Sequence, residues 1–119
     1  MKGHSFRDII AWQKAHSLCV DIYKILASNK DFSYRDQIQR AAVSIMNNIA
    51  EGHSRRSDKS FRNLLLIAKG SAAEVESMLE LGKSLGYFTS IQHEDLTQRV
   101  DEISRLITGL VKFLETRQP

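Results

Sequence analysis

The sequence has 119 residues, of which 42% are hydrophobic and 26% are charged, with one proline and six glycines. This length suits one domain built around one core, and the balanced composition excludes a largely disordered or collagen-like chain. The net charge is +3, but residues 1–62 carry 11 basic and 6 acidic side chains whereas residues 63–119 carry 6 and 8, so the basic surplus lies in the first half.

The single cysteine, Cys19, cannot form an intramolecular disulfide, and a lone thiol is typical of a reducing compartment. The residues that follow Met1 lack the apolar stretch of a secretory signal. No run approaches the ~18 apolar residues that a membrane-spanning helix needs. We therefore predict a cytoplasmic protein without a membrane partner.

The first predicted helix spans residues 7–28, where hydrophobic residues recur at intervals of three and four. Trp12, Cys19 and Ile22 belong to its buried stripe. Ser5 and Asp8 have the spacing of a capping box, in which two side chains bind free backbone N–H groups at a helix start.

The second predicted helix spans residues 34–51. Ser33 and Asp36 have the spacing of a second capping box, and Phe32 is placed to act as a hydrophobic staple before it. Gly52 stands where a helix commonly ends in the left-handed conformation.

The third predicted helix spans residues 58–85, with Ser57 as its N-cap and Gly86 as its terminating glycine. The fourth spans residues 92–116. Because short connections force consecutive helices to run antiparallel, we predict an all-α, up-down-up-down four-helix bundle that forms a single domain over residues 1–119.

A polar stripe lies beside the apolar stripe of the second helix. It contains Arg40, Asn48 and Glu51, and the third helix offers Ser71 and Glu74 opposite to it. Arg40 could form a partly buried ion pair with Glu51 or Glu74, because a guanidinium matches a carboxylate in geometry. The stripe is either a solvated face or a structural polar network that fixes the register of helices or subunits.

A basic cluster joins the second and third helices. Its cations are Arg55, Arg56, Lys59 and Arg62, and it opens a helix whose N-terminal N–H groups also favour anions. Phosphate is a natural ligand for such a site, although a loop with solubilising charge would have the same composition. The sequence shows no aromatic platform for bases, so any nucleic-acid binding should use the backbone and show little sequence preference.

The sequence holds no catalytic or metal-binding constellation. The four histidines, at positions 4, 16, 53 and 93, lack metal-ligand spacing, and there is no glycine-rich phosphate loop. No nucleophile and base stand at a spacing that suggests a reaction. We predict that the protein is not an enzyme and uses no cofactor, metal or small-molecule substrate.

Several motifs together resemble one known family. Residues 37–52, QIQRAAVSIMNNIAEG, closely resemble the signature of the four-helix-bundle proteins encoded in intervening sequences of bacterial 23S rRNA genes. FRDI at 6–9 with WQKA at 12–15 looks like that family's opening, and IAKGSAAE at 67–74 looks like its third-helix motif. The resemblance covers about residues 6–115.

This resemblance implies an assembly. Such families are similar to the accessory protein of diversity-generating retroelements, which implies a pentameric ring of bundles with a basic surface able to bind nucleic acid. Under the resemblance, a set of residues matches the family motifs and is assigned to structure or assembly: Arg40, Asn48, Glu51, Ser71 and Glu74.

Two functional hypotheses follow. The first is a homo-oligomeric, non-catalytic bundle, pentameric by resemblance, that binds RNA or DNA through the phosphates with the four cations of residues 55–62. The alternative is a protein-interaction or scaffold module whose basic charge is incidental and which has no nucleic-acid role.

Overall fold

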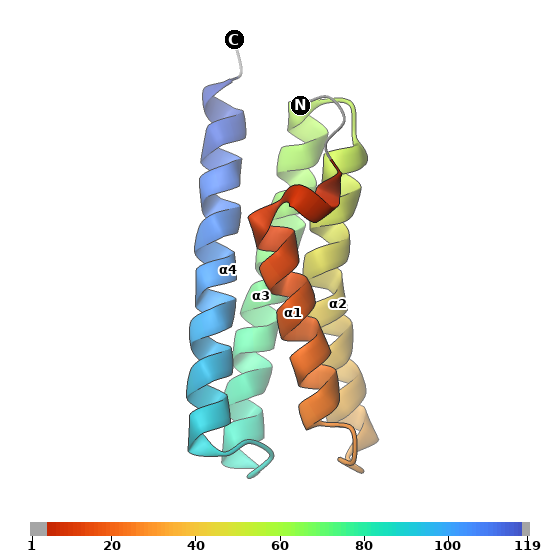
Figure 1. Ribbon diagram of the computed structural model, residues 1–119, viewed down its shortest axis with the longest axis vertical. Helices are drawn as coiled ribbons and strands as arrows, with labels where there is room; N and C mark the ends of the chain where they lie inside the picture. The colour runs from red at the N-terminus through yellow and green to blue at the C-terminus, as the bar shows by residue number, and fades with distance from the viewer. Residues whose placement is uncertain (1–4, 118–119) are drawn as a thin grey trace.

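The computed structural model describes residues 5–117, which form a short 3-10 helix and four α-helices without a strand. The elements, in chain order, are η1 (Phe6–Asp8), α1 (Ile10–Ile25), α2 (Phe32–Ser54), α3 (Asp58–Ser84) and α4 (Ser90–Thr116). The helices lie side by side along one long axis (Figure 1). The predicted all-α four-helix bundle is confirmed.

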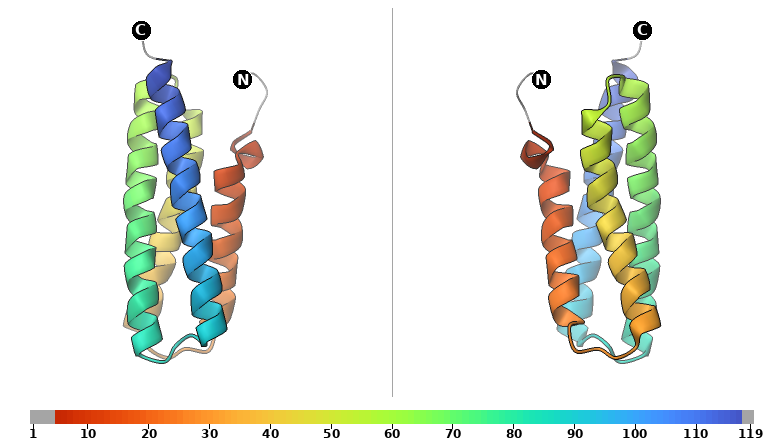
Figure 2. Two further views of the ribbon diagram at one scale, coloured as in Figure 1. Left: turned by 90° about the vertical axis from the view of Figure 1, so that its left-hand side faces the viewer. Right: turned by 90° about the vertical axis from the view of Figure 1, so that its right-hand side faces the viewer.

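Each long helix packs against two others, in the cyclic order α1, α2, α3, α4. The connections at residues 26–31 and 85–89 lie together at one end of the bundle, which we name the loop end (Figures 1 and 2). The opposite end carries η1, the connection at residues 55–57 and the last turn of α4, and we name it the terminal end (Figures 1 and 2).

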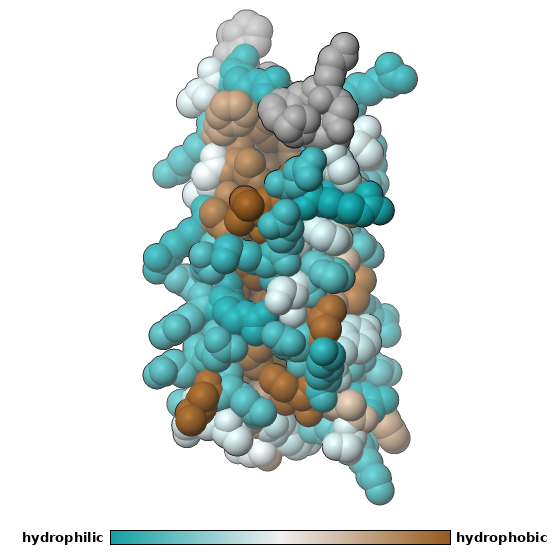
Figure 3. All heavy atoms as spheres, in the orientation of Figure 1, coloured by the Kyte–Doolittle hydropathy of each residue, from teal (hydrophilic) through white to brown (hydrophobic). Residues whose placement is uncertain are grey.

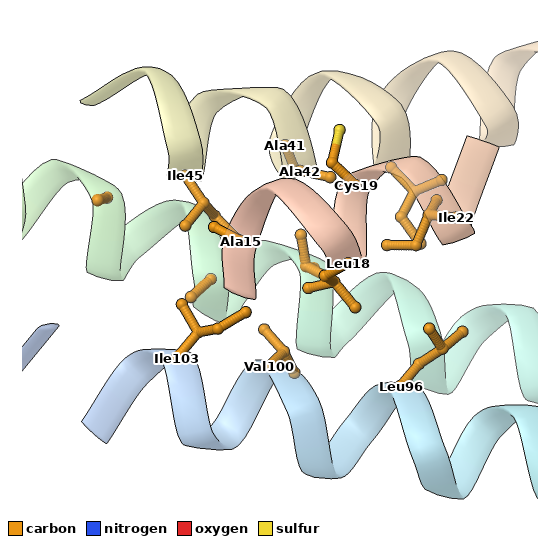
Figure 4. Close-up of a cluster of buried hydrophobic side chains, with 14 of the residues drawn as sticks. Ala15, Leu18, Cys19, Ile22, Ala41, Ala42, Ile45, Leu96, Val100 and Ile103 are labelled. Atoms are coloured by element: carbon orange, nitrogen blue, oxygen red, sulfur yellow. The ribbon is translucent and has the colours of Figure 1, made fainter. Parts of the chain in front are cut away.

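The core is a column of aliphatic side chains contributed by all four long helices. Figure 4 shows Leu18 of α1, Ile45 of α2, and Val100 and Ile103 of α4 directed toward one another. All four are fully buried, and burial of each such side chain contributes about 1.5–3 kcal/mol. Cys19 lies beside this column, where burial raises the pKa of its thiol, so it packs as a small uncharged residue.

The predicted first helix is divided in the structure. The capping box of Ser5 and Asp8 forms, but it closes the short η1 rather than the long helix. Ile9 is extended, with φ −78° and ψ 120°, so α1 begins only at Ile10, and it ends at Ile25. The prediction of one helix over residues 7–28 was therefore wrong at both ends.

The start and the end of α2 also differ from the prediction. Asp31 caps this helix by accepting a hydrogen bond from the Tyr34 N–H at 3.2 Å, and Phe32 is already helical and 58% exposed. The predicted capping box at Ser33 and staple at Phe32 were wrong.

Gly52 continues α2 instead of ending it, because α2 runs to Ser54. A Cβ on this glycine would lie 2.7 Å from Cδ1 of Phe61. The residue thus serves the close approach of α2 and α3, not a left-handed turn.

The limits of α3 and α4 match the prediction more closely. Ser57 caps α3 by accepting a hydrogen bond from the Ser60 N–H at 3.1 Å, and Gly86 follows the helix with φ +77°, as predicted. The helix α4 begins at Ser90 rather than at 92. A capping box of Thr89 and Gln92, absent from the prediction, accounts for the earlier start.

Candidate nucleic-acid interface

The four cations of the predicted basic cluster lie at the terminal end. Arg55 and Arg56 belong to the connection between α2 and α3, and Lys59 and Arg62 belong to the first turns of α3 (Figure 1). The last turn of α4 reaches the same place, because Arg117 binds Asp58, the first residue of α3, with 3.2 Å between Nε and Oδ2. Side chains from three segments therefore meet here.

Two of the predicted cations are already paired with carboxylates. The Arg55 guanidinium binds the carboxylate of Glu51 one turn earlier, and Nε of Arg62 lies 2.7 Å from Oε2 of Glu115 in α4. Exposed ion pairs of this kind contribute about 0–1 kcal/mol, so a phosphate can replace either carboxylate at little cost.

Arg56 and Lys59 are left without a carboxylate. Within residues 5–117, neither side chain makes an ion pair or a hydrogen bond, and both are exposed. They flank the N-terminus of α3, where aligned peptide dipoles and free N–H groups also attract anions. Two exposed cations without a carboxylate partner among residues 5–117 thus lie beside a helix start.

The predicted polar network forms only in part. The hydroxyls of Ser44 in α2 and Ser71 in α3 are hydrogen-bonded at 2.7 Å. The amide of Asn48 donates to the Ser44 carbonyl at 2.8 Å and to its hydroxyl at 3.0 Å. This chain of three half-buried side chains links α2 to α3.

The charged members of the predicted network stay outside it. Glu51 pairs with Arg55 instead of Arg40, since Arg55 follows it by one helical turn whereas Arg40 is ~16 Å away along the helix axis. Arg40 and Glu74 are exposed and make no ion pair with each other or with another described residue. The predicted pairing of Arg40 with Glu51 or Glu74 was wrong.

A polar hollow of about 580 Å³ lies between α2 and α3 and extends from the serine pair toward the loop end. Its wall carries cationic, anionic and hydroxyl groups together, so it offers no uniform charge to a ligand. The lining residues are Ser33, Asp36, Gln37, Arg40, Ala41, Ser44, Ser71 and Glu74.

An aromatic column at the start of α1 was missed by sequence reasoning. Trp12 and His16 stack with ring centroids 4.9 Å apart and planes 12° apart, and Phe6 meets Trp12 edge-on at 5.0 Å. The guanidinium of Arg7 covers the Phe6 ring at 4.6 Å. The spacing of Trp12 and His16 was a usable signal, because residues four apart are neighbours on a helix, but the place of Phe6 depends on η1.

Among residues 5–117, no three His, Cys, Asp or Glu side chains gather closely enough to hold a metal ion. In the same range, none of the helices has the length and hydropathy required to cross a membrane.

Comparison with known proteins identifies the family. Residues 7–109 match the family described as 23S rRNA-intervening sequence protein. The chain is also similar, at 34% sequence identity and a TM-score of 0.81, to a crystal structure from Bacteroides thetaiotaomicron, described as a protein with unknown function from the S23 ribosomal protein family. That similarity covers 87% of this chain and 99% of the other. No curated protein matches the sequence. This chain therefore belongs to the 23S rRNA-intervening sequence protein family.

Proposed function

We propose that this protein binds RNA or DNA at its terminal end, through backbone phosphates and without catalysing a reaction. The observation that carries the proposal is the pair of unpartnered cations, Arg56 and Lys59, beside the exposed N-terminus of α3. Arg55 and Arg62 add two guanidinium groups whose present carboxylate partners are exposed. The phosphates of a nucleic-acid backbone can bind all four of these cations.

Contacts of this kind recognise the charge and the spacing of the backbone phosphates rather than the identity of the bases. Each phosphate that a Lys or Arg neutralises releases counterions, so affinity should fall steeply with salt and vary little with sequence. A single cluster of this size binds weakly.

Assembly would raise that affinity. We propose that the protein is a cytoplasmic homo-oligomer, with five subunits as the resemblance implies, which presents several copies of the basic cluster to one nucleic acid. Once one cluster has bound, the next binds at a high effective concentration, so avidity exceeds the affinity of one site.

A neutralisation experiment tests the proposal. Replacing Arg55, Arg56, Lys59 and Arg62 with Gln should abolish retention of a labelled 30-nucleotide RNA or DNA at low salt. The matched control replaces four exposed lysines elsewhere, Lys24, Lys30, Lys69 and Lys83, with Gln, and should bind more tightly than the first variant by at least tenfold. Equal binding by the two variants would show that only overall charge matters and would refute the proposal.

A specific observation also favours the alternative, a protein-interaction or scaffold module. An apolar groove of about 430 Å³ lies between α1 and α4, formed by Ile9, Ile10, Ala11, Leu106, Gly109 and Leu110 with Arg105 at its edge. Figure 3 shows hydrophobic side chains gathered between α1 and α4 toward the terminal end. A stable protein partner recovered from cells together with no nucleic acid would support this alternative over the first proposal.

A further inference from the structure

The aromatic column is held in a fixed position by contacts around η1. The capping box of Ser5 and Asp8 closes the turn, and the side-chain amide of Gln13 donates to the Arg7 carbonyl at 2.8 Å. These bonds hold Phe6 against Trp12. The column is therefore ordered in the free protein, and a ligand that binds it does not lose affinity to the entropic cost of ordering these side chains.

The outer member of the column is free to bind. His16 is exposed, and none of its ring atoms makes a hydrogen bond or ion pair with another residue that the structure describes. One face of its ring lies against Trp12, so a planar group that stacks on this exposed side chain must use the other face. The ring nitrogens can also bond to a base edge or a phosphate.

The column runs from η1, toward the terminal end, down α1 to His16, whose neighbour Ala15 lies beside Ile45 in the middle part of α2 (Figure 4). η1 packs against both α1 and α2, at the end where α2 runs into the connection that holds Arg55 and Arg56 (Figure 1). Arg7 adds a further cation there, with its guanidinium over Phe6 and donating to the Ser5 hydroxyl at 3.0 Å. The column and the basic cluster thus lie along the same part of the molecule, about three turns of α2 apart, a span that a single nucleic-acid strand can bridge.

This combination is typical of proteins that bind unpaired strands. In a duplex both faces of each base are stacked, and an aromatic side chain cannot reach them, whereas a single strand exposes them to aromatic and guanidinium planes. Because every base has such a face, stacking adds affinity without sequence preference.

We propose that the column of Phe6, Trp12 and His16 is a stacking platform for unpaired bases, so that the ligand is single-stranded RNA or DNA. A base lies on the face of His16 that points away from Trp12, and phosphates farther along the same strand bind the cations of the connection between α2 and α3. This inference rests on the proposed function and goes further by selecting single strands over duplexes.

Trp12 supplies the test, because it is the only tryptophan in the chain and its emission reports on its neighbours. Three labelled ligands with about the same number of phosphates are compared: a 24-nucleotide oligothymidylate, a 24-unit abasic strand, and a 12-base-pair duplex. We expect the oligothymidylate to change the Trp12 emission and to bind at least fivefold more tightly than the abasic strand.

Two variants test whether the difference in affinity between the oligothymidylate and the abasic strand comes from the aromatic column. His16→Ala, at an exposed position, should reduce oligothymidylate affinity to the level of the abasic strand and leave abasic affinity unchanged. Phe32→Ala is the matched control. It removes an exposed aromatic ring that also lies under an arginine, Arg35 at 4.8 Å, but at the loop end, and it should change neither affinity. Far-ultraviolet circular dichroism verifies that both variants are folded.

The outcomes separate the two proposals. Equal affinity for the abasic strand and the oligothymidylate, with unchanged Trp12 emission, would overturn the stacking platform while leaving phosphate binding intact. Tighter binding of the duplex would overturn it as well. Failure of all three ligands to bind at low salt would refute the proposed function and the platform together.

Discussion

Gly82 of α3 and Tyr34 of α2 approach so closely that no side chain fits between them. A Cβ on Gly82 would lie 2.2 Å from the Tyr34 hydroxyl oxygen and 2.4 Å from Cε2 of Phe88. This approach lets the buried Tyr34 hydroxyl donate to the Met78 carbonyl at 2.5 Å. The contact ties the start of α2 to the last turns of α3 at the loop end.

Replacing Gly82 with Ala should therefore destabilise the protein. Placing a methyl group in this filled space should cost about 1–3 kcal/mol, and displacing the hydroxyl would add to that. Gly70→Ala is the control in the same helix, because its Cβ would meet nothing within 4 Å, and it should raise stability by up to about 1 kcal/mol. Urea unfolding of both variants measures the difference. Similar midpoints would mean that Tyr34 does not occupy the space beside Gly82.

A second contact at the loop end should make stability depend on pH. The Tyr87 hydroxyl donates to the Asp31 carboxylate at 2.5 Å, which lowers the pKa of Asp31 below its usual 3.8 and raises the pKa of Tyr87. A lowered carboxylate pKa stabilises the fold at pH values above 3.8, and that contribution is lost as the pH falls through the lowered pKa.

Tyr87→Phe removes the donor, so it tests this contribution. We expect the wild-type protein to have the higher urea midpoint near neutral pH, and the difference from the variant to shrink as the pH falls below 3.8 and Asp31 becomes protonated. On the alkaline side, the raised pKa of Tyr87 means that its contribution is lost as the pH rises above the usual tyrosine value of 10.0. A constant difference between the two proteins across the acid range would contradict the assigned bond.

The hydroxyl pair between α2 and α3 should be energetically coupled. A double-mutant cycle of Ser44→Ala and Ser71→Ala should give a coupling of about 0.5–1.5 kcal/mol, because each single change breaks the same 2.7 Å bond.

Arg40→Ala should change the free energy of unfolding by less than about 0.5 kcal/mol, since this exposed side chain has no partner among the described residues. A large loss of unfolding free energy in the Arg40→Ala monomer would show that Arg40 does belong to the polar network between α2 and α3.

The helices were predictable because their signals are local. Ser57 and Gly86 act where the sequence placed them, one as an N-cap and the other with positive φ. Gly52 has the same sequence context as a terminating glycine, but Phe61, nine residues later, determines its use. Local sequence cannot distinguish a glycine that ends a helix from one that admits a neighbouring helix.

The candidate site was predictable only in its composition. The four cations follow one another in sequence, so their clustering is a local property. The pairing of Arg55 with Glu51 is also local, but the pairing of Arg62 depends on Glu115, which is 53 residues away and reaches it only through the packing of α3 on α4. The aromatic column was missed for a related reason, because the extended residue Ile9 separates η1 from α1.

The assembly proposal predicts a particle larger than one 13.6 kDa chain. Light scattering coupled to size exclusion should give a whole multiple of that mass, five if the resemblance holds, both before and after nuclease treatment. A particle that falls to one chain after nuclease would show that nucleic acid, not protein contact, holds the copies together.

Phosphate binding by Arg56 and Lys59 is tested most directly by the salt dependence of single-strand affinity. Reversing both charges with Arg56→Glu and Lys59→Glu should make the plot of log affinity against log salt less steep by at least about 1.4, the value for two phosphate contacts. Lys24→Glu with Lys30→Glu makes the same change in net charge away from the terminal end and should leave the slope unaltered. Equal slopes for the two double variants would contradict the account.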